Sequence, residues 1–272
     1  MPVAHSTPTA VALTIAGSDS GGGAGIQADL KTFQAFGVFG TSVITAITAQ
    51  NTTGVYGVHA VPVDLVRQQV EVVVDDLAPA AVKTGMLATR ELVEAVADAI
   101  DAHRLKAFVL DPVMVATSGD RLLAEDAVDA VRTRLLPLAA LVTPNTHEAE
   151  LLLGHEVKTP EDLSRAARAL VELGARAALV KGGHLEGDEV VDLLWDGSHE
   201  YVWRHPRIKG REAHGTGCTL SAAVTAGLAQ GRTLEVVVGE AIDFVARALE
   251  SAPQLGRGST PLNHMVSARQ HV

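Results

Sequence analysis

The sequence is poor in cysteine and in aromatic residues, and each shortage excludes a class of protein. Cys218 is the single cysteine, so no intrachain disulfide can form, which is typical of a protein kept in a reducing compartment. No apolar run reaches the roughly 18 residues that a membrane-spanning helix needs. The stretch Met1–Thr9 lacks the basic start and long apolar core of a signal peptide, so we expect it to form a frayed leader.

Aromatic residues make up 3% of the chain, while hydrophobic residues as a whole make up 47%. The core must therefore be built from Ala, Val, Leu and Ile, which suits buried parallel strands covered by helices. The chain also lacks an excess of positive charge, since 22 Lys and Arg face 32 Asp and Glu, a net charge of −10. This balance argues against binding to nucleic acid or to an anionic membrane, and it still allows a local basic site for a phosphate.

The sequence does have a repeated order of strand, loop and helix along its 272 residues. This rhythm predicts a three-layer α/β fold, with a doubly wound and mostly parallel sheet between two layers of helices. Alternation around Asp196-Gly197 predicts a β-hairpin, and the turn-rich stretch 51–57 predicts a small flap. Because no linker or internal repeat is visible, we expect a single domain over residues 10–253, with a frayed tail at 1–9 and a loosely packed tail at 254–272.

Polar clusters follow most of the predicted strands, where ligands bind in sheets of this kind. The first cluster is a glycine-dense loop that begins at Gly17 and leads to Asp29 on the next helix. It lacks the Gly-Lys-Ser/Thr of a P-loop, so a ligand-binding loop and a simple tight turn are equal interpretations. Asp29 either complements the helix dipole or accepts from a ligand amine or hydroxyl. The amide of Gln50 can pair with the edge of an aminopyrimidine.

Two carboxylates and an asparagine follow later strands. Asp111 precedes Pro112, and Asn145 and Glu148 form an Asn-x-x-Glu pattern. Asp111 and Glu148 could hold Mg²⁺ through water, because this ion prefers oxygen ligands. The alternative is helix capping by Asn145 and a charge in the first turns of the helix from Glu148.

Two further clusters suit an anion. Lys181 ends a strand before two glycines and could reach a phosphate, although a solvated lysine is more common. The run Gly215-Thr216-Gly217-Cys218 opens a helix, where consecutive backbone N–H groups can form an anion hole. Cys218 falls in the first turn, where the helix dipole and any nearby cation would lower the thiol pKa; the alternative is a buried, inert thiol.

Taken together, these motifs resemble the hydroxymethylpyrimidine/phosphomethylpyrimidine kinase family of the ribokinase-like superfamily. The matching stretches cover nearly the whole chain: 12–20, 25–34, 42–52, 85–87, 110–115, 118–120, 143–145, 180–185, 214–223 and 261–264. The resemblance implies a ribokinase-like kinase that uses ATP and Mg²⁺ in thiamine biosynthesis. It phosphorylates 4-amino-5-hydroxymethyl-2-methylpyrimidine to the monophosphate and then to the diphosphate. It is expected to be a cytoplasmic homodimer that binds neither nucleic acid nor membranes.

The resemblance also implies roles for individual residues. The positions that hold or border the pyrimidine match Gly17, Asp29, Gln50 and Met86. The positions that bind the nucleotide match Thr143, Asn145 and Lys181. The positions that serve Mg²⁺ match Asp111 and Glu148, and the catalytic anion hole matches Gly215, Thr216, Gly217 and Cys218. Cys218 stands where sugar kinases of the superfamily have an aspartate base, so it is either a base or a lining of the hole.

The sequence departs from the family pattern in two places. Thr117 stands where the family usually has a lysine, and Glu212-Ala213 replaces an Asn-Thr pair. These departures bear on rate and phosphate affinity more than on the reaction class. Two other functions stay open, a pyridoxal kinase built on the same ATP half and a non-catalytic sensor that binds its ligand without consuming ATP.

Overall fold

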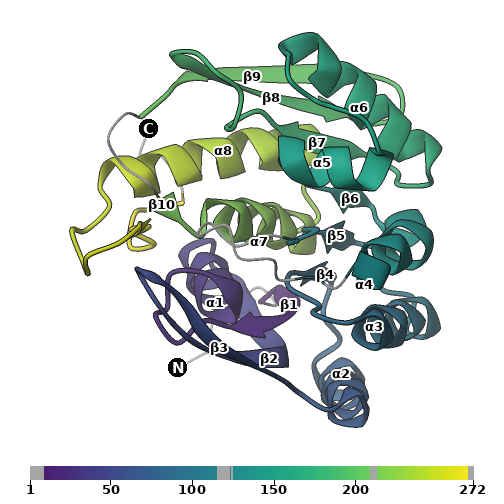
Figure 1. Cartoon of the computed structure of the whole chain (residues 1–272). Helices are drawn as coiled ribbons and strands as arrows, with labels where there is room; N and C mark the ends of the chain where they lie inside the picture. The colour runs from purple at the N-terminus through teal and green to yellow at the C-terminus, as the bar shows by residue number, and fades with distance from the viewer. Residues whose placement is uncertain (1–8, 115–122, 124, 209–212, 269–272) are drawn as a thin grey trace, which may run out of the picture.

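The computed structural model describes residues 9–114, 123, 125–208 and 213–268, and its main sheet has nine strands in the order β3-β2-β1-β4-β5-β6-β7-β8-β9. These strands are β1 (Val11–Ser18), β2 (Phe39–Asn51), β3 (Gly54–Ala60), β4 (Ala81–Thr84), β5 (Phe108–Leu110), β6 (Leu141–Val142), β7 (Ala178–Lys181), β8 (Glu189–Trp195) and β9 (Glu200–Pro206). The thin grey trace in Figure 1 marks the remaining residues, which include Thr117, Glu212 and the expected frayed leader up to Pro8.

The centre of the sheet is parallel and its edges are antiparallel. Each of the neighbouring pairs from β2 through β1, β4, β5 and β6 to β7 is parallel. The β2–β3 and β8–β9 pairs are hairpins, so both the predicted flap and the hairpin around Asp196-Gly197 are confirmed. Gly197 adopts φ of 92°, a left-handed conformation that the turn needs and that glycine adopts without a steric penalty.

Helices cover both faces of the sheet, which confirms the predicted three-layer α/β architecture (Figure 1). One layer holds α1 (Gly25–Ala35), α7 (Thr216–Ala229) and α8 (Leu234–Glu250), which share a hydrophobic cluster. The other layer holds α2 (Val63–Leu77), α3 (Arg90–Ala102), α4 (Glu125–Ala130), α5 (Thr146–Leu153) and α6 (Pro160–Glu172). Within the described part of the chain, no helix is both long and apolar enough to cross a membrane.

Alternating side chains of the central strands supply the two cores. On β5, Phe108 and Leu110 pack into the cluster with α3, whereas Val109 packs into the cluster with α7. On β7, Val180 packs into the cluster with α3, and Leu179 packs into the cluster with α7. Because successive strand residues point to opposite faces, a strand buried on both sides reads as a continuous apolar run.

The segment after Pro253 was predicted to be a loosely packed tail; residues 254–258 are exposed, whereas residues further along the segment contact the rest of the chain. Its strand β11 (Thr260–Pro261) pairs with β10 (Ala213–His214), directly before the N-terminus of α7. Leu262 is buried, and the Nε2 atom of His264 lies 2.9 Å from the hydroxyl of Thr219. These contacts hold the segment against the start of α7. Apolar periodicity in the sequence could not reveal them, because they are few and lie only at this junction.

Candidate active site

A cavity of about 1260 Å³ opens where the parallel strands end and α7 begins. It is lined by most of the predicted site residues: Gly17, Gln50, Met86, Asp111, Asn145, Glu148, Lys181, Gly215, Thr216, Gly217 and Cys218. These residues come from loops that lie far apart along the chain, and the parallel sheet brings them to one rim. Asp29 and Thr143 are predicted site residues that do not line the cavity.

Helix α7 presents its N-terminus to this cavity. Gly215 is the N-cap, has φ of 86°, and provides no side chain to cap the helix, so the first backbone N–H groups are available to an anion. A Cβ atom on Gly215 would meet the carbonyl oxygen of Gly23 at 1.9 Å. The two glycine-rich loops are therefore packed closely against each other, and the N-terminus of α7 stays open toward the cavity.

Asp111 lies between two lysines at the end of β5. Its Oδ1 atom is 3.6 Å from Nζ of Lys181, and its Oδ2 atom is 3.8 Å from Nζ of Lys83. The hydroxyl of Ser221 on α7 donates to Oδ2 at 3.0 Å. Burial acts to lower the pKa of Lys181, but the negative charges of Asp111, Glu148 and other groups outweigh this effect and raise the pKa. The side chain of Lys181 therefore carries a positive charge.

Glu148 caps α5 and faces the cavity as well. Asn145 accepts from the Glu148 backbone N–H at 2.9 Å, and the Glu148 carboxylate accepts from the Asn145 backbone N–H at 2.8 Å. The capping interpretation of this motif is thus confirmed, and it fixes the carboxylate in place. Burial, helped by the nearby Asp111 charge and opposed by Lys181, raises the pKa of Glu148 to about 7.

The donor set at Asp111 and Glu148 fits a hard divalent cation. Both carboxylates are buried and line the cavity, and the charge of Asp111 raises the cost of ionising Glu148. A cation placed between them would remove that cost. The described residues contain no cluster of three side chains able to hold a metal alone, which suits Mg²⁺, an ion that takes one or two carboxylates and completes its shell with water and phosphate oxygens.

Lys83 borders the site through Asp111 and is one of the residues that the sequence interpretation missed. Its side chain is wholly buried on β4, and its ammonium bonds to Asp29 at 2.8 Å. Burial acts to lower the pKa of Lys83, but Asp29, Cys218 and Asp111 raise it overall. The signal was available, because a lysine within the apolar strand that runs from Ala81 must find a buried partner.

Asp29 holds this lysine and does not reach the cavity itself. The carboxylate is fully buried, accepts from the Thr14 hydroxyl at 2.6 Å, and pairs with Lys83. The predicted direct contact between Asp29 and a ligand has no geometric support. Thr143 is fully buried too, and its hydroxyl has no hydrogen-bond partner in the described structure, so it also stays apart from the cavity.

Cys218 lies in the first turn of α7 and lines the cavity. Burial, reinforced by Asp111 and Asp29 and opposed by Lys83, raises the pKa of the thiol to about 12. The backbone N–H of Gly25 points at the sulfur and acts to lower that pKa. The expectation of a lowered thiol pKa was therefore wrong, because partial burial of the thiol and two buried carboxylates outweigh the helix dipole and Lys83.

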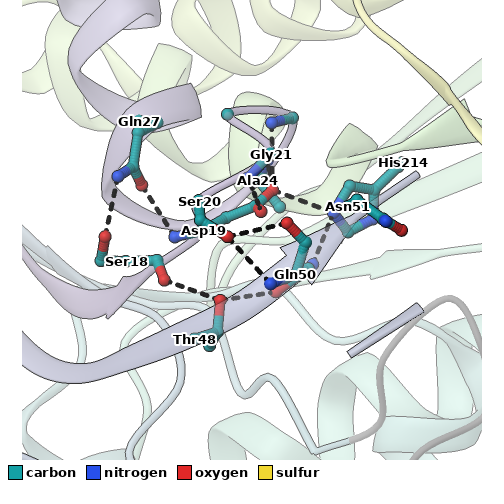
Figure 2. A network of polar contacts seen from close by, with 12 residues as sticks. Ser18, Asp19, Ser20, Gly21, Ala24, Gln27, Thr48, Gln50, Asn51 and His214 are labelled. Atoms are coloured by element: carbon teal, nitrogen blue, oxygen red, sulfur yellow. Dashed lines mark hydrogen bonds and ion pairs between the residues drawn. The ribbon is translucent and has the colours of Figure 1, made fainter. Parts of the chain in front are cut away.

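One side of the cavity is a polar network around Asp19 and Gln50 (Figure 2). The Asp19 carboxylate accepts from the backbone N–H groups of Gly21, Gly23 and Ala24, and it lies 3.2 Å from Nε2 of His214. Burial acts to raise the pKa of Asp19, but these hydrogen bonds lower it overall. The sequence interpretation passed over Asp19 and His214, since only the fold brings them together.

Gly17 and Met86 complete this side. A Cβ atom on Gly17 would come within 2.9 Å of the Met86 methyl group, so glycine allows Met86 to pack against the strand end. Met86 is buried apart from the face that lines the cavity. The pocket beside Gln50 is consequently apolar on the side of Met86 and polar on the side of Gln50 and Asp19, which suits a small heterocycle with polar substituents.

A family model described as phosphomethylpyrimidine kinase matches residues 19–263. The chain belongs to the phosphomethylpyrimidine kinase family. Two curated relatives are hydroxymethylpyrimidine/phosphomethylpyrimidine kinases, one from Streptomyces coelicolor and one from Bacillus subtilis. The first is 52% identical over 263 residues, 97% of each chain. The second is 47% identical over 262 residues, 96% of this chain and 97% of the relative.

Solved structures place this phosphomethylpyrimidine kinase family member among the vitamin kinases of the ribokinase-like fold. The phosphomethylpyrimidine kinase of Clostridium difficile has a TM-score of 0.79 and 41% identity, covering 88% of this chain and 98% of that one. The ADP complex of Bacillus subtilis pyridoxal kinase has a TM-score of 0.88 and 40% identity, covering 94% and 97%. The predicted fold and phosphotransferase class are confirmed.

Proposed function

We propose that this chain transfers a phosphoryl group from ATP to 4-amino-5-hydroxymethyl-2-methylpyrimidine, and then to the resulting monophosphate, in thiamine biosynthesis. One observation carries the proposal. A single cavity joins an amide that can read an aminopyrimidine, two carboxylates suited to Mg²⁺, a buried ammonium and a helix N-terminus. The family membership and the relatives' names support the same pair of reactions.

Positively charged and hydrogen-bonding groups of the cavity have separate proposed roles, the first toward the phosphate and the second toward the pyrimidine. Phosphoryl transfer depends on alignment and on neutralisation of charge more than on covalent help. Lys181 and the N–H groups of 216–218 face the cavity and would stabilise charge on the transferred phosphoryl oxygens. Gln50 would hold the pyrimidine and point its alcohol toward the N-terminus of α7.

Asp111 and Glu148 would hold Mg²⁺, directly or through water. The bound ion would neutralise charge on the phosphate oxygens of the nucleotide. Lys181 lies 3.6 Å from Asp111, so an incoming phosphate would share this ammonium with the carboxylate. Asp111 also receives the Ser221 hydroxyl from α7, which ties the metal-binding carboxylate to the helix that forms the anion hole.

Cys218 is proposed to line the anion hole and not to act as a base. A thiol whose pKa is raised to about 12 by burial remains protonated at neutral pH. In this form the sulfur is too weak a base to take the proton of the alcohol, as a thiolate would. The second reaction has an acceptor that is already anionic and needs no base. A common site can therefore serve both steps.

The proposed function is tested by product analysis with purified protein, MgATP and the pyrimidine alcohol, resolving the monophosphate from the diphosphate. Formation of both products is expected. The matched variants Asp111→Asn and Glu148→Gln, alone and together, should raise the Mg²⁺ concentration needed for half-maximal rate. ATP consumption without either product would exclude this substrate, and an unchanged metal titration in the double variant would remove both carboxylates from the metal site.

Phosphorylation of pyridoxal is a second candidate activity. It is supported by one observation, the TM-score of 0.88 to a pyridoxal kinase against 0.79 to a phosphomethylpyrimidine kinase. Comparing kcat/KM for the two alcohols under the same conditions decides which is the main activity. We expect the aminopyrimidine to be the better substrate, because the cavity offers the amide of Gln50, which can pair with the edge of an aminopyrimidine.

We also propose that the chain works in the cytoplasm as a homodimer. The β2–β3 hairpin exposes Ile47, Tyr56 and Val58 at the edge of the sheet, where an unpaired strand attracts a second copy. Sedimentation of the purified protein should give twice the chain mass, and Tyr56→Glu with Val58→Lys should give the monomer. A monomeric parent protein would exclude this arrangement.

A further inference from the structure

His214 stands where three segments of the chain meet. It lies on β10, paired with β11, and directly precedes Gly215 of the anion hole. Its Nε2 atom is 3.2 Å from Oδ2 of Asp19 and 2.9 Å from one of the two terminal positions of the Gln50 amide (Figure 2). The other amide position is 3.1 Å from the hydroxyl of Thr48. The ring is closely held, because a Cβ atom on Gly23 would come within 2.9 Å of it.

The hydrogen bonds that Asp19 accepts determine whether the Nε2 atom of His214 carries a hydrogen. Asp19 already accepts three backbone N–H groups, and an ionised carboxylate can only accept. The Nε2 atom of His214 must therefore carry a hydrogen that points toward Asp19 and Gln50. A nitrogen that carries a hydrogen cannot accept from an amide N–H, so the Gln50 position nearest His214 must be the oxygen.

The hydrogen bonds of Thr48 independently predict the same orientation of the Gln50 amide. Its single hydroxyl hydrogen is donated to the carbonyl oxygen of Ser18 at 2.9 Å. The hydroxyl can then only accept from the neighbouring position of the Gln50 amide, which must be the nitrogen. Figure 2 draws the nitrogen on the His214 side, but a half-turn about the last side-chain bond exchanges the two positions without moving any other atom.

We propose that His214 is a positioning residue that sets substrate specificity, by holding the Gln50 carboxamide with its oxygen toward the anion hole and its nitrogen toward Thr48. The inference deepens the proposed function and rests on it for the identity of the substrate. It assigns His214 to orientation alone, since the imidazole acts through Gln50 and not on the reacting atoms.

The orientation matches the order of groups on the aminopyrimidine. In 4-amino-5-hydroxymethyl-2-methylpyrimidine, the amine lies between the hydroxymethyl group and a ring nitrogen. An amide oxygen on the anion-hole side accepts from that amine, the amide N–H donates to the ring nitrogen, and the alcohol is left pointing at the hole. In pyridoxal the group beside the hydroxymethyl is an aldehyde, whose oxygen would face the amide oxygen without a hydrogen between them.

Nuclear magnetic resonance tests the amide orientation without any substrate. The side-chain NH₂ signals of Gln50 can be assigned in ¹⁵N-labelled protein by their loss in Gln50→Glu. We expect nuclear Overhauser contacts from these protons to the Thr48 methyl group and none to the His214 ring. Contacts to the ring protons and none to Thr48 would overturn the proposal.

Calorimetric binding of the two alcohols, without ATP, tests the specificity. The variant His214→Leu removes the donor, His214→Gln keeps an N–H near the place of Nε2, and His103→Leu removes an imidazole outside the cavity. We expect His214→Leu to lower the preference for the aminopyrimidine over pyridoxal by roughly ten-fold or more, the cost of one unsatisfied hydrogen bond. His214→Gln should recover most of the preference, and His103→Leu should keep all of it.

The two failures can be told apart. If His214→Leu keeps the full preference while folding normally, as judged by circular dichroism, the role of His214 is wrong even though the proposed kinase activity stands. If the parent protein binds neither alcohol, the proposed function fails, and the resonance experiment alone then decides whether His214 orients Gln50.

Discussion

The ammonium of Lys83 lies 2.8 Å from the carboxylate of Asp29, and solvent reaches neither side chain. This ion pair joins β4 to α1, and the same ammonium is 3.8 Å from Asp111, which lines the cavity. The pair therefore places a fixed positive charge behind the carboxylate proposed to bind Mg²⁺. It explains why a charged residue is tolerated inside a strand that is buried on both faces.

Breaking this pair should destabilise the protein strongly. Lys83→Met leaves Asp29 buried without its cation, and the expected loss is about 3–5 kcal/mol in the free energy of unfolding. The double variant Lys83→Met with Asp29→Asn should lose less than Lys83→Met alone, because no charge is left unpaired. Urea denaturation followed by circular dichroism measures both.

The surface pair of Arg67 and Asp98 provides the control for that experiment. Its atoms are 3.2 Å apart, but both side chains are 47% exposed. Arg67→Met should cost no more than about 1 kcal/mol, because water screens exposed pairs. If Lys83→Met were as mild as Arg67→Met, the buried pair would have no special weight in the fold.

The raised thiol pKa predicts a small effect of removing the sulfur. Cys218→Ala should reduce the rate of the first phosphorylation by less than about ten-fold, whereas loss of a general base typically costs about 10²–10⁴-fold. The second phosphorylation should change by a similar small factor. Single-turnover rates for both steps check this, and a selective collapse of the first step would restore the base role.

Gly215 should tolerate no side chain. Its φ of 86° disfavours other residues, and a Cβ atom there would collide with the Gly23 carbonyl oxygen at 1.9 Å. Gly215→Ala is therefore expected to lower both stability and kcat, by more than ten-fold for the rate. The matched control is Gly154→Ala, at φ of 76° with open space around the new methyl group.

That control separates backbone strain from the collision. Gly154→Ala should cost only about 1–2 kcal/mol of stability, the strain of the left-handed conformation, and it should leave kcat intact. Thermal melting and steady-state kinetics on both variants give the comparison. Equal effects of the two substitutions would mean that the close packing between the two glycine loops is unimportant.

Acid should loosen the contact between the C-terminal segment and α7. Burial lowers the pKa of His264 to about 4, below its ordinary value of 6.5, and Lys31 adds to this. Between pH 4 and pH 6.5 the unfolded chain therefore binds a proton on His264 that the folded chain does not bind. The contribution of His264 to the free energy of unfolding is complete above pH 6.5, and it is lost as the pH falls from 6.5 toward 4.

The expected loss at pH 5 is about 2 kcal/mol relative to pH 7.5, an upper figure for a partly exposed ring. His264→Gln keeps a polar group near Thr219 without titrating, so it should flatten this part of the stability curve. Urea denaturation at pH 5, 6 and 7.5 provides the measurement. A curve of unchanged steepness in the variant would assign the acid sensitivity to other groups.

The helix start at Gly215 and the Asn145 capping motif could be predicted from the sequence, because each is made by residues that are neighbours along the chain. The run from Gly215 to Cys218 encodes its own turn, and Asn145 and Glu148 sit three residues apart, the spacing at which they cap each other. The burial of Asp29 and Thr143 could not be predicted, because it depends on what packs over them. Asp29 meets Lys83, 54 residues away, and that partner is visible only when β4 lies beside β1.

The sequence by itself determined the order of strands and helices, the parallel core and the kinase family, because periodicity and local motifs are properties of adjacent residues. Tertiary structure alone decided which charges are buried together, and so raised the Cys218 pKa, placed Lys83 behind Asp111 and set His214 against Gln50. The physical reason is that desolvation and Coulomb energy depend on distances through space between groups that lie far apart along the chain.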